Sequence, residues 1–166
     1  MKLDIIPAHK DMCKELANIK KQVWQTTYKG IYPNEKVNDF NIDEQTKKFL
    51  DILTSSSIKL YVVKYNNRII GYTAIGKSPR RQNADFYELV LLYVLKEFQG
   101  KGIGKSLFNF AKEKLRELNH NYFMIYCNKY NINAHNFYLK MGCKIIEIDP
   151  DNEDKSKPQT KFIYQF

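Results

Sequence analysis

The chain has few cysteines, glycines and prolines, and it has no long hydrophobic run. Its 3 cysteines, Cys13, Cys127 and Cys143, are odd in number and match neither a C-x-x-C pair nor a zinc-ligand spacing. No apolar stretch approaches the ~18 residues of a membrane helix, and the N-terminal segment does not resemble a secretory signal. We therefore expect a cytoplasmic protein with reduced thiols, no metal and no membrane partner.

Acidic residues are also scarce, with 18 against 27 basic ones, so the formal net charge is +9. Such a charge favours anionic partners, which include nucleic acid, acidic lipid and phosphorylated cofactors. No run of five or more lysines and arginines occurs, and the densest basic cluster is Lys77–Arg81. Because nucleic-acid binders carry clustered basic residues, we expect no nucleic-acid partner.

The length and composition indicate one folded domain, residues 1–166. Apolar residues make up 43% of the chain and aromatic residues 14%, which excludes intrinsic disorder. A chain of 166 residues matches the size of a single domain and can bury a core of its own. The prolines fall at the breaks between predicted elements, and no flexible linker is visible.

Hydrophobic periodicity predicts an α+β fold in which helices cover a mixed sheet. The run Leu89–Leu95 is apolar on both faces, as a central strand requires, and Asn66-Asn67 predicts a tight hairpin turn. Asp43 is placed to cap a helix. The predicted strands are Lys2–Ile6, Ile58–Tyr65, Arg68–Lys77, Asp85–Leu95, Tyr122–Cys127, Cys143–Ile148 and Lys161–Tyr164, and the predicted helices are Ala8–Tyr28, Asp43–Leu53, Gly102–Leu118 and Asn131–Met141.

Three of the seven glycines lie within five residues, at Gly100, Gly102 and Gly104, between the central strand and a long helix. Glycine costs about 0.5–1 kcal/mol in a helix relative to alanine, so the clustering needs a reason. Backbone without Cβ atoms lets a phosphate approach the free N–H groups at the helix start, where the helix dipole is positive. Lys101 and Lys105 add charge. The alternative is a flexible turn, for which one glycine would suffice.

Two familiar phosphate motifs do not fit this loop. A P-loop requires G-x-x-x-x-G-K-[ST], and Gln99 stands where its first glycine should be. A dinucleotide fingerprint requires G-x-G-x-x-G, and Lys105 or Leu107 occupies its last glycine position. The loop instead matches the pattern Q-x-x-G-x-G.

The loop resembles the acetyl-CoA-binding motif of the GNAT N-acetyltransferases. The matching residues are Gln99-Gly100-Lys101-Gly102-Ile103-Gly104, preceded by Leu92-Tyr93-Val94. A second segment, Asn131 to Gly142, resembles the family pattern N-x-x-A-x-x-F-Y-x-x-x-G-F. The two motifs in this order are highly specific, although Cys143 stands where the family usually has phenylalanine. The resemblance implies a mostly antiparallel sheet of about seven strands, with helices on both faces, that splays between two parallel central strands.

The resemblance also implies acetyl-CoA as the cosubstrate. The loop amides would bind the pyrophosphate, and the central strand would pair with the pantetheine arm, with the amide of Val94 on the thioester oxygen. Asn131 would bond the arm from the facing helix. The expected cofactor-binding residues are Leu92, Tyr93, Val94, Gln99, Gly100, Lys101, Gly102, Ile103, Gly104, Lys105, Ser106 and Asn131.

Direct transfer of an acetyl group to an amine needs an acid for the leaving thiolate and a base for the amine. Tyr138 is the candidate acid, because a phenol can donate a proton to a thiolate at little cost; the alternative is a core aromatic residue. Glu88 is the candidate base, since it is the acid on the central strand eleven residues before Gln99 and matches the base of glutamate-using members of the family. Its alternative role is a solvated strand end.

The acceptor pocket is expected to involve Trp24, Tyr28 and Tyr32, which equally fit an ordinary core. The segment from Glu147 to Asp154 is acidic in an otherwise basic chain. It is either a solvated loop or a negative lip that attracts a cationic amine. We expect the acceptor to be a primary amine, with a polyamine or another small amine favoured over a protein lysine or N-terminal amine.

Two other classes of protein compete with a catalytic acetyltransferase. A non-catalytic acyl-CoA sensor would keep the glycine loop and lose Tyr138, which is present. A nucleic-acid-binding protein ranks last because the lysines are dispersed. Either a monomer or a homodimer is compatible with the sequence, and the last strand could be an edge that pairs with a second copy.

Overall fold

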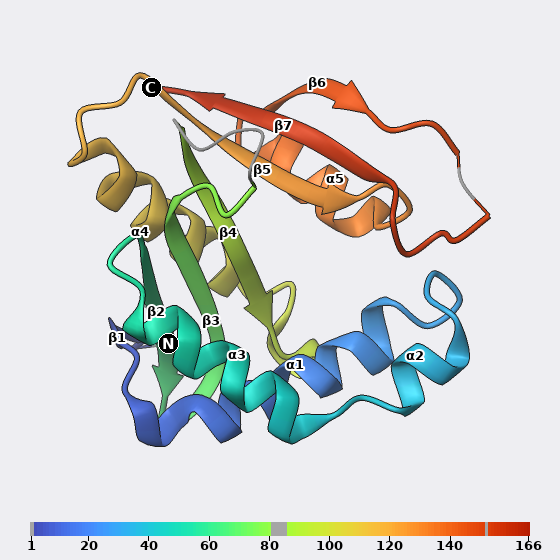
Figure 1. The fold of residues 1–166 in the computed structure, drawn as a ribbon. Coiled ribbons are helices and arrows are strands. Elements are labelled where there is room, and N and C mark those ends of the chain that lie inside the picture. Colours follow the sequence, from blue (N-terminus) through green and yellow to red (C-terminus); the bar gives the residue numbers. More distant parts are fainter. Residues whose placement is uncertain (1, 81–85, 152) are drawn as a thin grey trace.

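A computed structural model describes residues 2–80, 86–151 and 153–166, and it has the predicted α+β architecture (Figure 1). Short 3₁₀ turns precede α1 and α4. The elements are β1 (Asp4–Pro7), α1 (Cys13–Thr27), α2 (Asn34–Asn38), α3 (Ile42–Thr54), β2 (Ile58–Tyr65), β3 (Arg68–Lys77), β4 (Tyr87–Val94), α4 (Ile103–Arg116), β5 (Tyr122–Asn128), α5 (Ile132–Lys140), β6 (Lys144–Ile148) and β7 (Gln159–Gln165).

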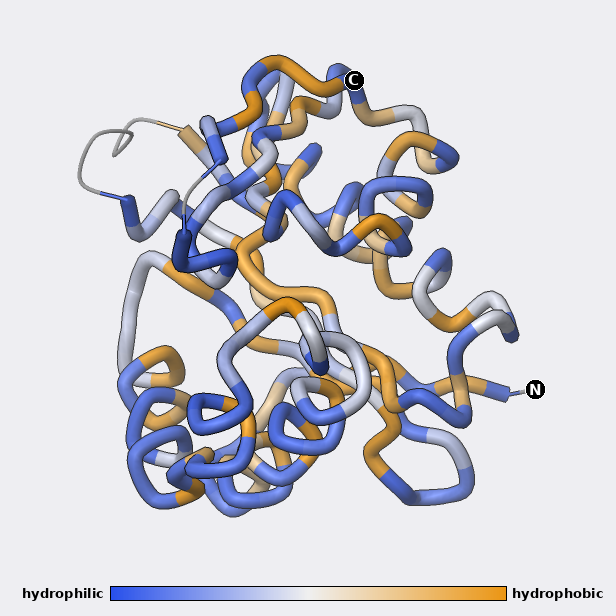
Figure 2. Tube along the Cα trace, turned by 90° about the vertical axis from the view of Figure 1, so that its right-hand side faces the viewer, coloured by the Kyte–Doolittle hydropathy of each residue, from blue (hydrophilic) through white to orange (hydrophobic). Residues whose placement is uncertain are grey.

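Seven strands form one sheet in the order β1-β2-β3-β4-β5-β7-β6. Every neighbouring pair is antiparallel except β4 with β5. Helices α1 and α3 pack on one face of the sheet, and α4 and α5 pack on the other. Seen from the side, hydrophobic stretches of the chain run through the middle of the molecule, between more hydrophilic outer segments (Figure 2). The predicted fold class is confirmed.

Alternation along the strands and stripes along the helices explain these layers. The neighbouring residues Val62 and Val63 are both fully buried and belong to cores on opposite faces. Along α4, Ile103, Leu107 and Leu115 are buried at helical spacing. The helix was predicted to extend to Leu118, but it ends at Arg116 and Leu118 is exposed.

Several local expectations were wrong. Asn41, not Asp43, caps α3, because its Oδ1 atom accepts a hydrogen bond of 3.0 Å from Glu44 N. The short helix α2 was not predicted. The last strand, β7, is not an edge, because it lies between β5 and β6. Asp85, the predicted start of the central strand, lies outside the described residues, whereas the Asn66-Asn67 turn is confirmed by positive φ angles of 48° and 63°.

The central strands β4 and β5 separate along their length. Their only parallel pairing joins Glu88 and Met124, near the start of both strands. Further on, β4 has a bulge at Val90, where the pairing with β3 shifts register between Ala74 and Ile75. Figure 1 shows the two strands diverging toward their carboxyl ends. The predicted splay is therefore present, and it opens a gap in the middle of the sheet.

Candidate active site

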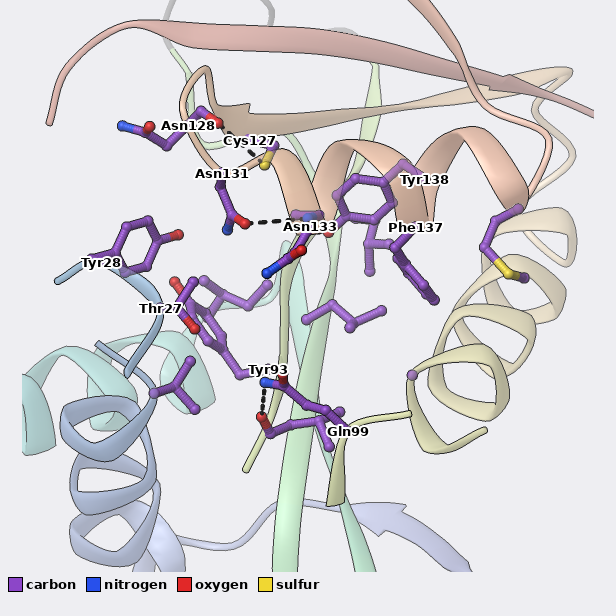
Figure 3. A pocket seen from close by; sticks show the side chains of 18 of the residues that line it. Thr27, Tyr28, Tyr93, Gln99, Cys127, Asn128, Asn131, Asn133, Phe137 and Tyr138 are labelled. Atoms are coloured by element: carbon purple, nitrogen blue, oxygen red, sulfur yellow. Dashed lines mark hydrogen bonds between the residues drawn. The ribbon is translucent and has the colours of Figure 1, made fainter. Parts of the chain in front are cut away.

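A cavity of about 800 Å³ occupies the gap between β4 and β5. It extends from the glycine turn before α4, past the end of β4, to the end of α1 and the start of α5. Figure 3 shows Asn131, Asn133 and Tyr138 of α5 facing Tyr28 of α1 and Tyr93 of β4 across this space. Segments from both halves of the chain thus meet at one site.

The backbone of β4 presents unpaired hydrogen-bonding groups to the cavity. Leu95 N donates to Ile70 O, and Val94 is paired with Gly71 in the antiparallel β3–β4 ladder. Successive residues of a strand point their backbone groups to opposite sides, so Leu92 and Val94 direct theirs away from β3 and into the gap. Gln99 Nε2 donates a hydrogen bond of 2.9 Å to the carbonyl oxygen of Val94, so this carbonyl already has a partner. The N–H groups of Leu92 and Val94 are placed where an extended ligand can pair with them.

The glycine turn forms a cradle at the other end of the cavity. Gly100 and Gly102 have φ angles of +74° and +83°, which residues with side chains rarely adopt, and a Cβ atom added at either position would have no neighbour within 4 Å. Gly102 caps α4, and the first helical hydrogen bond runs from Ser106 N to Gly102 O at 3.0 Å. The amides before Ser106 therefore have no partner within the helix. The first turn of α4 carries no acidic residue, so the cradle fits a diphosphate.

Not every predicted cofactor-binding side chain reaches the cavity. The side chain of Ile103 is buried in the core, and the Ser106 hydroxyl bonds Gly102 O at 3.2 Å. The ammonium of Lys101 lies over the Phe98 ring, whereas Lys105 does line the cavity. For Ile103 and Ser106, the backbone alone is available to a ligand.

Asn131 joins the two walls of the cavity. As the cap of α5, its Oδ1 atom accepts a hydrogen bond from Ala134 N at 3.2 Å. Burial raises the pKa of the Tyr28 hydroxyl, and a hydrogen bond with Asn131 opposes that shift. Tyr28, which follows α1, and Asn131, which precedes α5, therefore lie near each other across the splay.

Tyr138 lines the cavity and is only 7% exposed. Its ring packs against Phe137 and Phe162, so part of the residue belongs to the core. Burial raises the pKa of its hydroxyl well above 10, and the nearby Cys127 contributes to the shift. The phenol therefore stays protonated at neutral pH, as a proton donor must.

The predicted acceptor residues form an aromatic cluster at the end of α1. The rings of Tyr28 and Tyr32 stack with centroids 4.3 Å apart, and both residues line the cavity. Trp24 does not line it; its ring packs edge-on against both tyrosines from behind. Burial raises the pKa of the Tyr93 hydroxyl, and the neighbouring polar groups of Trp24 and Tyr28 oppose that rise. Trp24 thus supports the pocket wall instead of forming it.

Glu88 is buried, at 2% exposure, which overturns the alternative of a solvated strand end. It accepts a hydrogen bond of 2.7 Å from Ser78 Oγ and lies 3.6 Å from Arg80 Nε. Burial raises the pKa of this carboxyl, and the hydrogen bond from Ser78 and the charge of Arg80 oppose the rise. Glu88 lies on β4 one residue before the cavity-lining Leu89, not in the wall itself.

The acidic segment after β6 does not form one continuous negative lip. Glu147 pairs with Lys161, and Asp151 pairs with Lys129 at 2.9 Å. Asp149 accepts a hydrogen bond from a backbone amide, Gln159 N. These carboxylates are held by this chain's own donors, because the loop folds back against β5 and β7. Among the described acidic residues of the segment, Glu153 and Asp154 line a second cavity.

Sequence reasoning missed several residues that line the site. Cys127 and Asn128 at the end of β5 and Asn133 on α5 belong to the cavity wall. The expectation that ligands bind at the carboxyl ends of strands would have found the first two. Burial raises the pKa of the Cys127 thiol to about 12, so it is protonated and is not a ready nucleophile.

Comparison with known proteins decides the family. Residues 21–143 match the family described as "Acetyltransferase (GNAT) family". The chain belongs to the GNAT family. It is 27% identical over 135 residues to a spermidine N(1)-acetyltransferase of Thermoplasma acidophilum, a match that spans 81% of this chain and 83% of that one. It is 32% identical over 95 residues to an uncharacterized N-acetyltransferase of Lactobacillus delbrueckii subsp. lactis, and it spans about half of that relative's length (54%).

Solved structures share the GNAT fold over the whole chain. The crystal structure of PaiA N-acetyltransferase from Thermoplasma acidophilum, in complex with coenzyme A, matches with a TM-score of 0.82, at 22% identity and full coverage of both chains. Ribosomal-protein-alanine N-acetyltransferase from Brucella melitensis matches with a TM-score of 0.76, at 16% identity, over 98% of this chain and 99% of that one. Within the described part of the chain, no helix is long and apolar enough to cross a bilayer.

Proposed function

We propose that this GNAT domain, taken as residues 1–166, moves an acetyl group from acetyl-CoA to a primary amine by direct transfer, and that a polyamine or another small amine is the acceptor. The observation that carries the proposal is one continuous cavity with two chemically different ends. One end is the glycine cradle at Gly100 and Gly102, and the other is the aromatic cluster of Tyr28 and Tyr32. The relative named spermidine N(1)-acetyltransferase supports the polyamine.

In the proposed reaction, the N–H groups of Leu92 and Val94 hold the thioester arm, and that of Val94 stabilises the oxyanion that forms on the carbonyl. The amine nitrogen attacks the carbonyl carbon, and the C–S bond breaks as the amide C–N bond forms. Tyr138 gives its proton to the leaving thiolate. The nitrogen loses a proton, which Glu88 takes through water because it does not line the cavity. The products are an N-acetyl amine and free CoA.

An amine panel tests this function. The protein is incubated with acetyl-CoA and, separately, with spermidine, a monoamine, a lysine-containing peptide and a peptide with a free N-terminus, and thiol release is measured. We expect turnover with the small amines. Turnover with the peptides alone would favour a protein acetyltransferase. Tight CoA binding without any turnover would favour a sensor.

Glu88→Gln tests the assignment of the base. Glu88 must be ionised to accept a proton, so kcat/KM of the wild type rises with pH through the raised pKa of this carboxyl. The glutamine variant should lose about 10²-fold in kcat/KM and should lack that rise. Arg80→Gln should shift the rise to higher pH, because the charge of Arg80 lowers the pKa of Glu88. An unchanged pH profile in Glu88→Gln, with reduced thermal stability, would make Glu88 a structural residue.

A further inference from the structure

A second, outer cavity adjoins the proposed acceptor end of the site. It has a volume of about 530 Å³ and lies between the turn after α1 and the β6–β7 loop, which face each other in Figure 1. Tyr32 lines both cavities, so the two cavities adjoin at this residue. The residues that line the outer cavity are Gly30, Ile31, Tyr32, Pro33, Asn34, Glu153, Asp154 and Lys155.

The β6–β7 loop is held in place against the body of the protein. Asn128 Nδ2, on a side chain that is 3% exposed, donates to Lys155 O at 2.9 Å. The Asp154 carboxylate accepts hydrogen bonds from the backbone and the side chain of Ser156, which is itself buried. These contacts fix the position from which Glu153 and Asp154 face the outer cavity.

A cation of this chain already contacts one residue of the outer cavity, Tyr32. The Lys36 ammonium lies 4.9 Å from the centroid of the Tyr32 ring. Because Tyr28 is stacked on one face of Tyr32, Lys36 must lie over the other. The same ammonium donates to Ser156 Oγ at 2.9 Å, and Ser156 Oγ donates to Asp154. An aromatic face backed by a carboxylate binds ammonium groups in general. Lys36 is exposed, so it can leave this position at little cost.

We propose that the outer cavity is a subsite for a second ammonium group of the acceptor, and that the Lys36 ammonium holds the Tyr32 ring beside this cavity until such an acceptor binds. The subsite consists of the Tyr32 ring, Glu153 and Asp154. This inference rests on the proposed function and narrows it: the acceptor is a diamine or a polyamine, not a monoamine. One nitrogen reaches the thioester as the free amine, while the other stays charged in the outer cavity.

The charges around the cavity agree with this assignment. The Glu153 carboxylate has no hydrogen bond or ion pair with the described residues, whereas the three other acidic side chains of the segment outside the cavity are engaged. Across the described lining of the inner cavity there is no aspartate or glutamate. Asp154 is ion-paired with Lys157 at 3.4 Å, and Lys155 also lines the outer cavity, so Glu153 is the carboxylate that faces a charged second nitrogen there. The inner cavity offers such a nitrogen no carboxylate.

The test compares hexane-1,6-diamine with heptylamine, in which a methyl group replaces the second ammonium. Lys36→Met should raise kcat/KM for the diamine by about two- to fivefold, the factor that an exposed cation–π contact represents, and leave heptylamine unchanged. Glu153→Gln should lower kcat/KM for the diamine by about two- to fivefold. Lys47→Met is the matched control, because it removes the same charge from an exposed position on α3.

Calorimetry on the complex with CoA measures diamine binding without turnover. Tighter binding by Lys36→Met and weaker binding by Glu153→Gln support the subsite even if catalysis fails, and turnover of heptylamine tests the proposed function by itself. The subsite is overturned if neither variant differs from wild type. In that outcome, Lys36→Met and Glu153→Gln have the wild-type ratio of kcat/KM for the diamine to kcat/KM for heptylamine, and they bind the diamine with the wild-type affinity. Equal effects of Lys36→Met and Lys47→Met would also overturn it, because net charge alone would then explain the gain.

Discussion

Tyr138→Phe is expected to lower kcat on the order of 10²-fold or more, with little change in the KM for acetyl-CoA. Tyr138 lines the cavity, and burial raises the pKa of its hydroxyl, which keeps it protonated. The thiol of the leaving group is also desolvated in this cavity, which raises its pKa and makes a phenol an adequate donor. The measurement is steady-state thiol release at saturating acetyl-CoA. Removing the hydroxyl takes away proton donation in the transition state and leaves the bound ground state intact.

Tyr164→Phe is the matched control for this prediction. It makes the same chemical change on β7, where the Tyr164 ring stacks on Phe123 outside the cavity. Both variants should keep the thermal stability of the wild type, because no hydrogen bond to the Tyr138 hydroxyl is present in the described part of the chain. Equal turnover by wild type and Tyr138→Phe would remove Tyr138 from the mechanism and make it a core residue.

Gly100→Val and Gly102→Val are each expected to weaken CoA binding at least about tenfold. Both glycines have positive φ angles, which cost a side-chain residue roughly 1–2 kcal/mol and more for a β-branched one. The added side chain enters open space, so the fold tolerates it, but that is the space from which a diphosphate approaches the amides. About 1.4 kcal/mol corresponds to tenfold in affinity. Isothermal titration with CoA measures the loss without any acceptor.

Gly142→Val is the control that separates a loss of CoA binding from the effect of backbone strain alone. Gly142 has a φ angle of +89°, and an added Cβ would make only an ordinary contact with Tyr164. The three variants should lose similar thermal stability, and only the two in the turn before α4 should lose affinity for CoA. An unchanged affinity in Gly102→Val would show that the diphosphate does not bind at this turn, and the proposed function would lose its main support.

The elements with strong local signals were predicted well from the sequence. β2 and β3 have the predicted bounds, because two apolar runs flank an Asn-Asn turn whose residues adopt left-handed conformations readily. The helix after the glycine turn begins where Gly102 allows the required positive φ angle. Predictions from weaker local signals were wrong. The helix α2 was missed because it has only five residues, and the cap of α3 was assigned to Asp43 although the nearby Asn41 provides it.

The position of the last strand could not be read from its own residues. Its alternating aromatic side chains fit an edge or an interior position equally well, and pairing with both β5 and β6 is a long-range outcome. The choice between a solvated loop and a negative lip for the acidic segment also depended on distant residues, because nothing local indicates that Lys129 and Lys161 will pair with its carboxylates. Ion pairs between distant segments depend on topology, which composition does not reveal.

The sequence alone predicted the family, the fold class and the glycine turn, because each prediction came from residues that are close together along the chain. Glycine spacing, helix caps and strand alternation are local constraints on the backbone, so they can be read directly. Only the tertiary structure decided which side chains share the cavity. Trp24 packs behind the cavity wall and does not line it. Glu88 is buried beside Ser78 and Arg80. Lys36 contacts Tyr32 and Ser156. Those outcomes follow from packing between segments far apart in the chain, where burial and competing partners set the role of each polar group.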